Sequence, residues 1–329
     1  MAAWEAMKRW ISQAGGNDES GVDCLQRVQC ECLKTYGFET GSADDREHRV
    51  SKMTLKLCTV SLFVVLTTST LAAGAGRLAI ADGVATEVVF LLEAQDRVVG
   101  VDETSRFPDA ARELPQIGYF RRLSAEGVLS LNPDLLLAAP SAGPTVALEQ
   151  IKSAGVEVVK LPEVDVLDDV APKVLAIGAA LGMTPRALDL AATIRADIRD
   201  LRANVPTWAV APRVLFVLAI RESAPLVAGY GTTSDEIIRE AGAINAASFE
   251  GFKPMSREAV IAAAPDLVLM TDEHSVALGG ANSILKRPEF SLTPAGRSQR
   301  SLTLPALAVL GLGPRTPGAI RTLREALGP

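Results

Sequence analysis

Two segments of this chain carry the same order of structural signals. The first reads SAEGV from residue 124 and continues through NPD into the apolar run LLLA; the second reads SREAV from residue 256 and continues through APD into LVLM. Serine is a favoured helix N-cap, and proline ends a helix. Each copy therefore predicts a short helix followed by a buried strand. Because the unit occurs twice, we predict two related lobes.

Strand and helix signals alternate around each copy of this unit. Apolar runs predict strands at residues 77–81, 97–101, 135–139, 156–161, 213–220, 267–270 and 302–304. Helical spacing predicts helices at residues 83–94, 145–153, 234–241, 256–264, 283–288 and 316–327, with loops at residues 102–115, 221–233 and 272–280. Alternation at such short intervals predicts mostly parallel sheets that are covered by helices on both faces.

Residues 165–204 interrupt this alternation. Their apolar positions, from Val170 to Ile198, follow helical spacing over a long distance. We therefore predict an α/β protein with two doubly wound lobes, at residues 76–164 and 205–329, joined by one long backbone helix at residues 165–204. A ligand cleft is expected between the lobes.

The N-terminal region predicts export. Residues 53–75 combine positive charge at the start, an apolar stretch and the small-residue exit AGA, which is the pattern of a secretory signal peptide. We predict that this signal starts at Met53 and directs the protein to the periplasm, and that residues 1–52 are a non-native or disordered extension. A cytoplasmic tail with a membrane anchor is the alternative. Cys58 is the last of four cysteines, so no disulfide framework is predicted beyond it.

Composition and motifs exclude several classes of function. The net charge of −6 at pH 7 gives no support for a nucleic-acid partner. The glycine-rich segment at residues 229–231 lacks the third glycine and the acidic ribose partner of a dinucleotide site. The sequence contains no Gly-x-Ser-x-Gly motif and no P-loop, and we predict that the protein is not an enzyme.

The main candidate site is the turn Gly118-Tyr119-Phe120-Arg121-Arg122, which directly precedes the first copy of the repeated unit. A tyrosine before a helix can present a phenolate oxygen, and two neighbouring arginines can present cations to the same ligand. A flat molecule that carries a metal and carboxylates suits these groups, and haem fits this description.

The segments LPQIGYFRRLSAEGVLSLNPDLLLA, APLVAGYGTTSDEIIREAGAINA and FEGFKPMSREAVIAAAPDLVLM resemble the periplasmic binding proteins of haem ABC transporters. The resemblance implies two lobes joined by one long helix, with haem as the transported ligand. It implies that Tyr119 ligates the haem iron, while Arg121 and Arg122 pair with propionates or favour the phenolate. It also implies delivery of haem to an inner-membrane ABC permease with its cytoplasmic ATPase, and we expect a monomer.

The chain departs from this family at three positions. Some relatives carry a histidine ligand in the loop after the first strand of the second lobe, but here that loop holds Arg221, which is expected to meet a propionate. Tyr230 stands where the family commonly has arginine, and it is a candidate second phenolate or stacking group. His274 is the single histidine after the predicted signal; its loop should open toward the cleft, so it is a further candidate ligand or a solvated side chain.

The family's docking carboxylates, one in each lobe, fall on Glu126 and Glu258. Both also stand at a predicted helix start, where a carboxylate favours the helix dipole, so the two roles are compatible. Arg315, in the sequence GPRT, is expected to be structural. The alternative function is a siderophore or cobalamin binding protein, which would share this fold and these glutamates.

Overall fold

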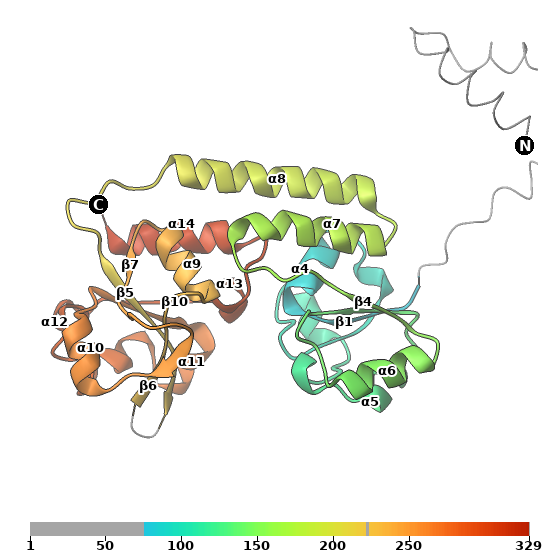
Figure 1. Ribbon diagram of the computed structural model, residues 1–329, viewed down its shortest axis with the longest axis horizontal. Helices are drawn as coiled ribbons and strands as arrows, with labels where there is room; N and C mark the ends of the chain where they lie inside the picture. Colours follow the sequence, from blue (N-terminus) through green and yellow to red (C-terminus); the bar gives the residue numbers. More distant parts are fainter. Residues whose placement is uncertain (1–75, 222–223, 329) are drawn as a thin grey trace, which may run out of the picture. The chain divides into compact units, whose positions relative to one another are not determined.

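The computed structural model of the protein describes residues 76–221 and 224–328, which form two α/β lobes with one sheet each (Figure 1). The predicted extension at residues 1–52 and the predicted signal at residues 53–75 lie outside the described residues. Within the described ranges, no helix combines the length and apolar character needed to cross a bilayer.

The N-terminal lobe contains a four-stranded sheet in the order β2-β1-β3-β4, with all neighbours parallel. Its strands are β1 (Leu78–Ala81), β2 (Val98–Val101), β3 (Leu135–Ala138) and β4 (Glu157–Lys160). The connecting helices are α4 (Gly83–Leu91), η2 (Gln95–Arg97), η3 (Asp109–Glu113), η4 (Phe120–Arg122), α5 (Ala125–Leu129) and α6 (Thr145–Ser153). The parallel sheet predicted for this lobe is confirmed.

The link between the lobes consists of two helices rather than the single helix predicted at residues 165–204. A short turn, η5 (Leu167–Asp169), leads into α7 (Val170–Ala180), and α8 (Thr184–Ala203) then runs back alongside it (Figure 1). The break follows from Gly182, whose φ of +70° ends α7, and from a proline in the first turn of α8. Helix α7 packs on α4, whereas α8 packs on the closing helix α14 (Thr316–Leu327).

The C-terminal lobe contains a six-stranded sheet in the order β10-β9-β5-β6-β8, with β7 paired to β5. Its strands are β5 (Arg213–Arg221), β6 (Ala224–Ala228), β7 (Ile244–Asn245), β8 (Phe252–Pro254), β9 (Leu267–Thr271) and β10 (Ser301–Leu304). Strand β6 is antiparallel to both β5 and β8, so the sheet is mixed. The prediction of a loop at residues 221–233 was wrong. The sequence of β6 contains a proline, which argues against a strand, but pairing with β5 stabilises the strand.

The helices of this lobe are α9 (Thr233–Glu240), α10 (Arg257–Ala263), α11 (Asp272–Ala277), η6 (Ala281–Lys286), α12 (Pro294–Ser298), α13 (Ala306–Leu310) and α14. The loop predicted at residues 272–280 was also wrong, since α11 occupies most of it. The side-chain oxygen of Thr271 accepts a hydrogen bond from the backbone N–H of His274 at 3.2 Å and caps this helix. A threonine cap followed by two acidic residues is a helix-start signal, although the helix is too short to show a clear period.

Both copies of the repeated unit form the same local structure. Ser124 and Ser256 cap α5 and α10, each accepting a backbone N–H three residues on. After each helix, an aspartate accepts the backbone N–H of an arginine at the start of a central strand: Asp134 from Arg77, just before β1, at 2.7 Å, and Asp266 from Arg213, the first residue of β5, at 2.8 Å. The predicted relation between the lobes therefore extends to individual hydrogen bonds.

Alternating strand residues divide the apolar interior into layers. In β1, Leu78 and Ile80 face one large cluster, whereas Ala79 and Ala81 face a cluster confined to the N-terminal lobe. In the C-terminal lobe, Phe216 faces the large cluster, and its neighbours in β5 face a separate one. The large cluster also includes buried residues of α7, α8 and α14, so it is continuous from one lobe to the other beneath the linking helices.

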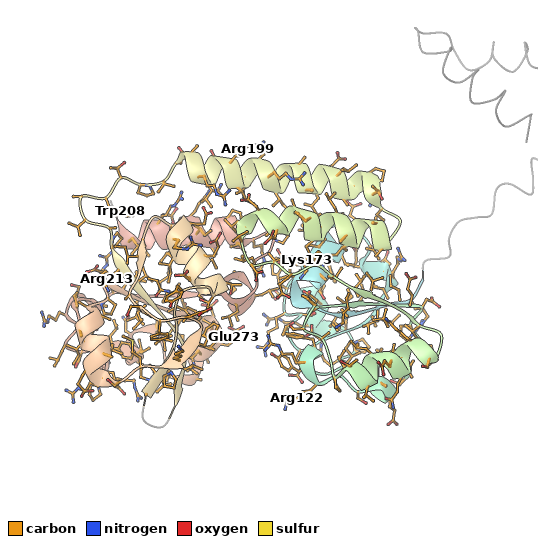
Figure 2. All side chains as sticks on the ribbon, in the orientation of Figure 1. Arg122, Lys173, Arg199, Trp208, Arg213 and Glu273 are labelled. Atoms are coloured by element: carbon orange, nitrogen blue, oxygen red, sulfur yellow. The ribbon has the colours of Figure 1, made fainter. Side chains whose placement is uncertain are left out.

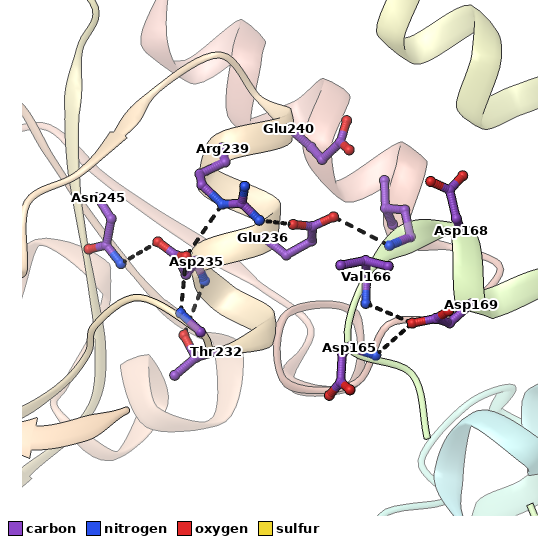
Figure 3. A network of polar contacts seen from close by, with 12 residues as sticks. Asp165, Val166, Asp168, Asp169, Thr232, Asp235, Glu236, Arg239, Glu240 and Asn245 are labelled. Carbon is purple, nitrogen blue, oxygen red and sulfur yellow. Dashed lines mark hydrogen bonds and ion pairs between the residues drawn. The ribbon is translucent and has the colours of Figure 1, made fainter. Parts of the chain in front are cut away.

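A polar network joins the C-terminal lobe to the start of the linking helices (Figure 3). Glu236 of α9 accepts the backbone N–H of Leu167 at 3.4 Å and pairs with Arg239. Farther along the linking helices, Arg202 of α8 pairs with Asp168 at 3.0 Å and with Glu240 at 2.6 Å. These contacts add a polar connection to the continuous apolar cluster.

Candidate functional site

A cleft of about 1040 Å³ is lined by residues of both lobes. Its walls are formed by the segments that follow the carboxyl ends of β1, β2, β3, β9 and β10. In open α/β sheets this edge is where ligands bind. The volume is at the upper end of the roughly 300–1,000 Å³ of small-molecule sites, which indicates a large ligand.

Apolar side chains that are partly open to solvent occupy the cleft walls. Phe107 comes from the N-terminal lobe, and Phe252, Val276 and Leu310 come from the C-terminal lobe. Val276 is 79% exposed. Such walls suit a ligand with broad apolar faces.

Tyr119 lines this cleft and is half-buried. Gly118, with a φ of +89°, turns the chain, and the backbone of Phe120 is tied to the neighbouring loop because its carbonyl accepts the N–H of Gly143 at 2.9 Å. The Tyr119 ring meets the Phe120 ring edge-on, with centroids 4.7 Å apart. Within residues 76–221 and 224–328, the phenol oxygen makes no hydrogen bond to protein, so it is available to a ligand.

The two arginines of the predicted turn lie differently. Arg121 lines the cleft, with its guanidinium 5.3 Å from the centroid of the Phe120 ring. Arg122 lies 5.9 Å from the centroid of the Tyr119 ring, at the edge of its lobe, and is not among the described lining residues (Figure 2). In the described part of the chain neither arginine has a carboxylate partner. The structure thus brings Tyr119 and Arg121 together in the cleft.

Two other predicted residues belong to the hairpin of β5 and β6 or follow it. The backbone of Arg221 ends β5, paired with Ala224 across the hairpin. Tyr230 is 51% exposed, forms an isolated backbone bridge with Glu250 and is absent from the described cleft lining.

His274 also lies outside the described cleft lining, in α11 rather than in a loop. Its Nε2 accepts the backbone N–H of Ile220 at 3.1 Å, which ties α11 to β5. Burial lowers the pKa of His274, and the hydrogen bond requires the neutral ring. This arrangement gives the Nε2 of His274 a structural contact.

Four cationic residues of the cleft were missed by sequence reasoning. They are Arg106, Arg112 and Lys173 of the N-terminal lobe and its link, together with Arg315, which was expected to be structural only. The charged loop at residues 102–115 directly follows β2, and that position was the available signal for the first two. Nothing local distinguishes Lys173, because it stands in the middle of α7.

The cations of the cleft differ in how firmly they are paired. Lys173 forms a buried ion pair with Asp82 at 2.6 Å. Arg315 pairs with Glu87 at 2.9 Å and stacks on Phe107, with its guanidinium 3.6 Å from the ring centroid.

Two acids near the cleft floor have raised pKa values. Burial raises the pKa of Glu87 even though Arg315 opposes the shift, and the other oxygen of Glu87 has no partner among the described residues. Burial likewise raises the pKa of Asp102 to about 6, against the hydrogen bonds that it accepts from Thr104 and Ser105.

Glu126 and Glu258 occupy the second positions of α5 and α10, and both are exposed. The pKa of Glu258 is lowered by a hydrogen bond from its own backbone N–H and by the Ser256 hydroxyl. The two glutamates are equivalent positions of the repeated unit, one in each lobe.

A comparison with protein families matches residues 78–308 to a single family, that of the periplasmic binding proteins. The chain belongs to this family. The resemblance stated from the sequence motifs is confirmed, and so is the assignment to a family of binding proteins rather than enzymes.

Individual relatives refine this result. The structure of the periplasmic heme-binding protein BhuT in complex with two hemes is 43% identical, with a TM-score of 0.72, over 77% of this chain and 97% of that one. An uncharacterized ABC transporter substrate-binding lipoprotein of Bacillus subtilis, YvrC, is 26% identical over 74% of this chain and 77% of its own length. A vitamin B12-binding protein of Vibrio cholerae is 26% identical over 59% of this chain and 70% of its length.

Proposed function

We propose that this periplasmic binding protein captures haem in the cleft between its lobes and delivers it to an ABC permease of the inner membrane. The observation that carries the proposal is the Tyr119 phenol, which lines a large apolar-walled cleft without a hydrogen-bond partner in the described chain. The similarity to a heme-binding protein at 43% identity supports the same ligand.

Tyr119 supplies the axial ligand, because an anionic phenolate is a suitable donor to ferric haem iron. Arg121 neutralises a propionate from the cleft wall, and Arg122, which lies beside the Tyr119 ring, is a second cation for a propionate. Phe107, Phe252 and Val276 contact the faces or edges of the porphyrin. The backbone of Arg221 ends β5, and Tyr230 follows β6.

Delivery uses Glu126 and Glu258, which are exposed at equivalent positions of the two lobes and meet arginines of the permease. Helix α8 acts as the long backbone between the lobes, since it packs on α7 at one end and on α14 at the other. The continuous apolar cluster beneath these helices supports small lobe motions rather than wide closure. The protein acts as a monomer.

A cobalamin binder of the same fold is the second candidate, favoured by the similarity to a vitamin B12-binding protein. Cobalamin has no use for the Tyr119 phenolate, because the cobalt of that ligand already carries a lower axial group. The lower sequence identity of this relative also ranks the candidate below haem.

A hemin titration of the purified protein tests the proposal. We expect saturable binding with the absorption spectrum of a phenolate-ligated ferric haem, including its charge-transfer band. Tyr119→Phe should abolish that band, whereas Tyr230→Phe removes an exposed phenol outside the described cleft lining and should retain it. An unaltered spectrum in Tyr119→Phe would refute the ligand assignment. Failure of the unchanged protein to bind hemin, with saturable binding of cobalamin, would favour the second candidate.

A further inference from the structure

Arg106 and Glu273 face each other across the cleft. Arg106 belongs to the loop after β2 in the N-terminal lobe, and Glu273 is the second residue of α11 in the C-terminal lobe. The guanidinium Nη1 lies 3.8 Å from the carboxylate Oε1, and both residues line the cleft. Glu273 lies on the side of its lobe that faces the other lobe (Figure 2).

The backbone that carries Arg106 is held firmly on both sides. Ser105 is buried, and its hydroxyl donates to Asp102 at 2.9 Å. Phe107 lies under the Arg315 guanidinium. The carbonyl of Arg106 itself accepts the Nε–H of Arg112 at 2.9 Å.

The side chain of Arg106 is held much less firmly than its backbone. Its contacts among the described residues are the ion pair with Glu273 and a hydrogen bond of 3.3 Å from Nε to the Glu103 carbonyl. The two paired side chains are 58% and 41% exposed. An ion pair this long and this exposed contributes little, so a better-placed carboxylate displaces it readily.

The backbone that carries Glu273, on the opposite wall, is also held firmly. Thr271 caps α11, and His274 accepts the backbone N–H of Ile220, so the helix start is tied to β9 and β5. The carboxylate of Glu273 therefore stays within reach of Arg106 whether or not the pair is formed.

A second arginine extends the cationic surface around Arg106. Arg112 lines the same cleft, and both arginines also line an adjoining hollow of about 340 Å³ together with Glu103, Ser105 and Gln116. Arg112 has one carboxylate nearby, that of Asp109 at 3.6 Å, which is almost fully exposed. The wall thus offers two guanidinium groups whose ion pairs are long and solvated.

We propose that Arg106, supported by Arg112, is a carboxylate-binding subsite of the cleft, and that Glu273 competes with the ligand's carboxylate for Arg106. The identity of that ligand carboxylate, a haem propionate, rests on the function proposed above. Glu273 thereby lowers the affinity for carboxylate-bearing porphyrins. When the ligand leaves, Glu273 pairs with Arg106 again.

Titrations with hemin and with hemin dimethyl ester, which lacks free carboxylates, test this competition. Glu273→Gln should lower the Kd for hemin about three- to tenfold and leave the Kd for the ester unchanged. Arg106→Gln should raise the Kd for hemin by a similar factor, and in the double variant the gain from Glu273→Gln should disappear. Glu163→Gln is the matched control, because Glu163 also lines the cleft but pairs with no cation in the described chain; its effect should be clearly smaller.

The outcomes separate this inference from the function on which it rests. No saturable hemin binding by the unchanged protein would overturn the proposed function and this inference with it. Saturable binding that Glu273→Gln leaves unaltered, or weakens, would overturn the inference alone. Equal gains in Glu273→Gln and Glu163→Gln would also overturn it, because they would indicate a general effect of negative charge rather than competition for Arg106.

Discussion

One buried carboxylate near the cleft, that of Asp102, is held by hydroxyl groups, whereas Asp82 and Glu87 are paired with cations. Asp102 is fully buried, and its oxygens accept hydrogen bonds from the Thr104 and Ser105 hydroxyls at 2.8 to 2.9 Å. Burial disfavours the charged form, and these hydrogen bonds only partly compensate. The nearby carboxylate of Asp82 adds a smaller repulsion in the same direction. The loop that carries Arg106 is therefore anchored by a buried aspartate whose ionised form is disfavoured by burial.

The raised pKa of Asp102 predicts how the stability of the protein depends on pH. The pKa of Asp102 is about 6 in the folded protein, against an ordinary value of 3.8 for an aspartate. The folded state therefore holds this proton more tightly, and the group's contribution to the free energy of unfolding rises as pH falls from above 6 toward 3.8. Asp102→Asn should stabilise the protein by about 1–2 kcal/mol at pH 7, with the gain shrinking toward pH 4.

Urea unfolding between pH 4.5 and 7.5 measures this difference. Asp189→Asn is a matched control, because Asp189 is exposed on α8 and its carboxylate makes no contact with other described residues. The control should show no such trend. A stability difference between Asp102→Asn and the unchanged protein that does not vary with pH would contradict the assignment.

At the scale of elements, the close packing of α7 on α8 depends on one glycine. A Cβ placed on Gly178 would lie 2.1 Å from the Cβ of Ala187, which is fully buried. Small residues at this crossing let the two helices approach closely. The turn at Gly182 can then send α8 back over α7 and on toward α14.

Gly178→Ala should therefore destabilise the protein. The clash costs about 1–3 kcal/mol, which exceeds the gain of at most about 1 kcal/mol in helix propensity. Gly318→Ala is the control: Gly318 lies in α14, and a methyl group added there would meet no described atom within 4 Å, so this change should be neutral or slightly stabilising. Denaturant unfolding compares Gly178→Ala with Gly318→Ala. Adding Ala187→Gly to Gly178→Ala should recover part of the lost stability. Equal stability of Gly178→Ala and Gly318→Ala would contradict the packing argument.

At the scale of the whole described molecule, the lobes share one apolar cluster, and each lobe also has a smaller buried cluster of its own. The shared cluster, Arg202 with its two carboxylates and the contact of Glu236 with Leu167 all lie at the linking helices. Ion pairs also join the lobes at the cleft: the exposed pair of Arg106 with Glu273 at 3.8 Å, and the pair of Arg315 with Glu87 at 2.9 Å, in which the glutamate is buried. The shared apolar cluster thus lies at the linking helices, and ion pairs add contacts between the lobes at the cleft.

Docking to the permease is expected to involve both lobes at once. The double variant Glu126→Arg, Glu258→Arg should abolish haem transfer, and stimulation of ATP hydrolysis, in vesicles that contain the permease and its ATPase. Hemin affinity should be unchanged, because both side chains are exposed and absent from the described cleft lining. Asp96→Arg with Glu325→Arg makes the same change in net charge at exposed positions of both lobes and should leave transfer intact. Loss of hemin binding in the first double variant would assign these glutamates a structural role.

The sequence by itself determined the features that depend on neighbouring residues. Ser124 and Ser256 predicted two helix starts, and these serines cap α5 and α10. The apolar runs predicted each strand of the parallel sheet in the N-terminal lobe, because hydrogen bonds of caps and alternation of side chains act over a few residues. The motif around Tyr119 was sufficient to indicate the family.

Only the tertiary structure decided which charged groups meet at the cleft. Arg106 and Glu273 are far apart in sequence, as are Arg315 and Glu87, and only folding brings each pair together. His274 was a candidate ligand by its sequence position, but a backbone N–H from another strand takes its Nε2. Strand β6 likewise formed against β5 despite its proline. Long-range partners decide these outcomes, since the energy of a contact depends on distance in space and not on separation along the chain.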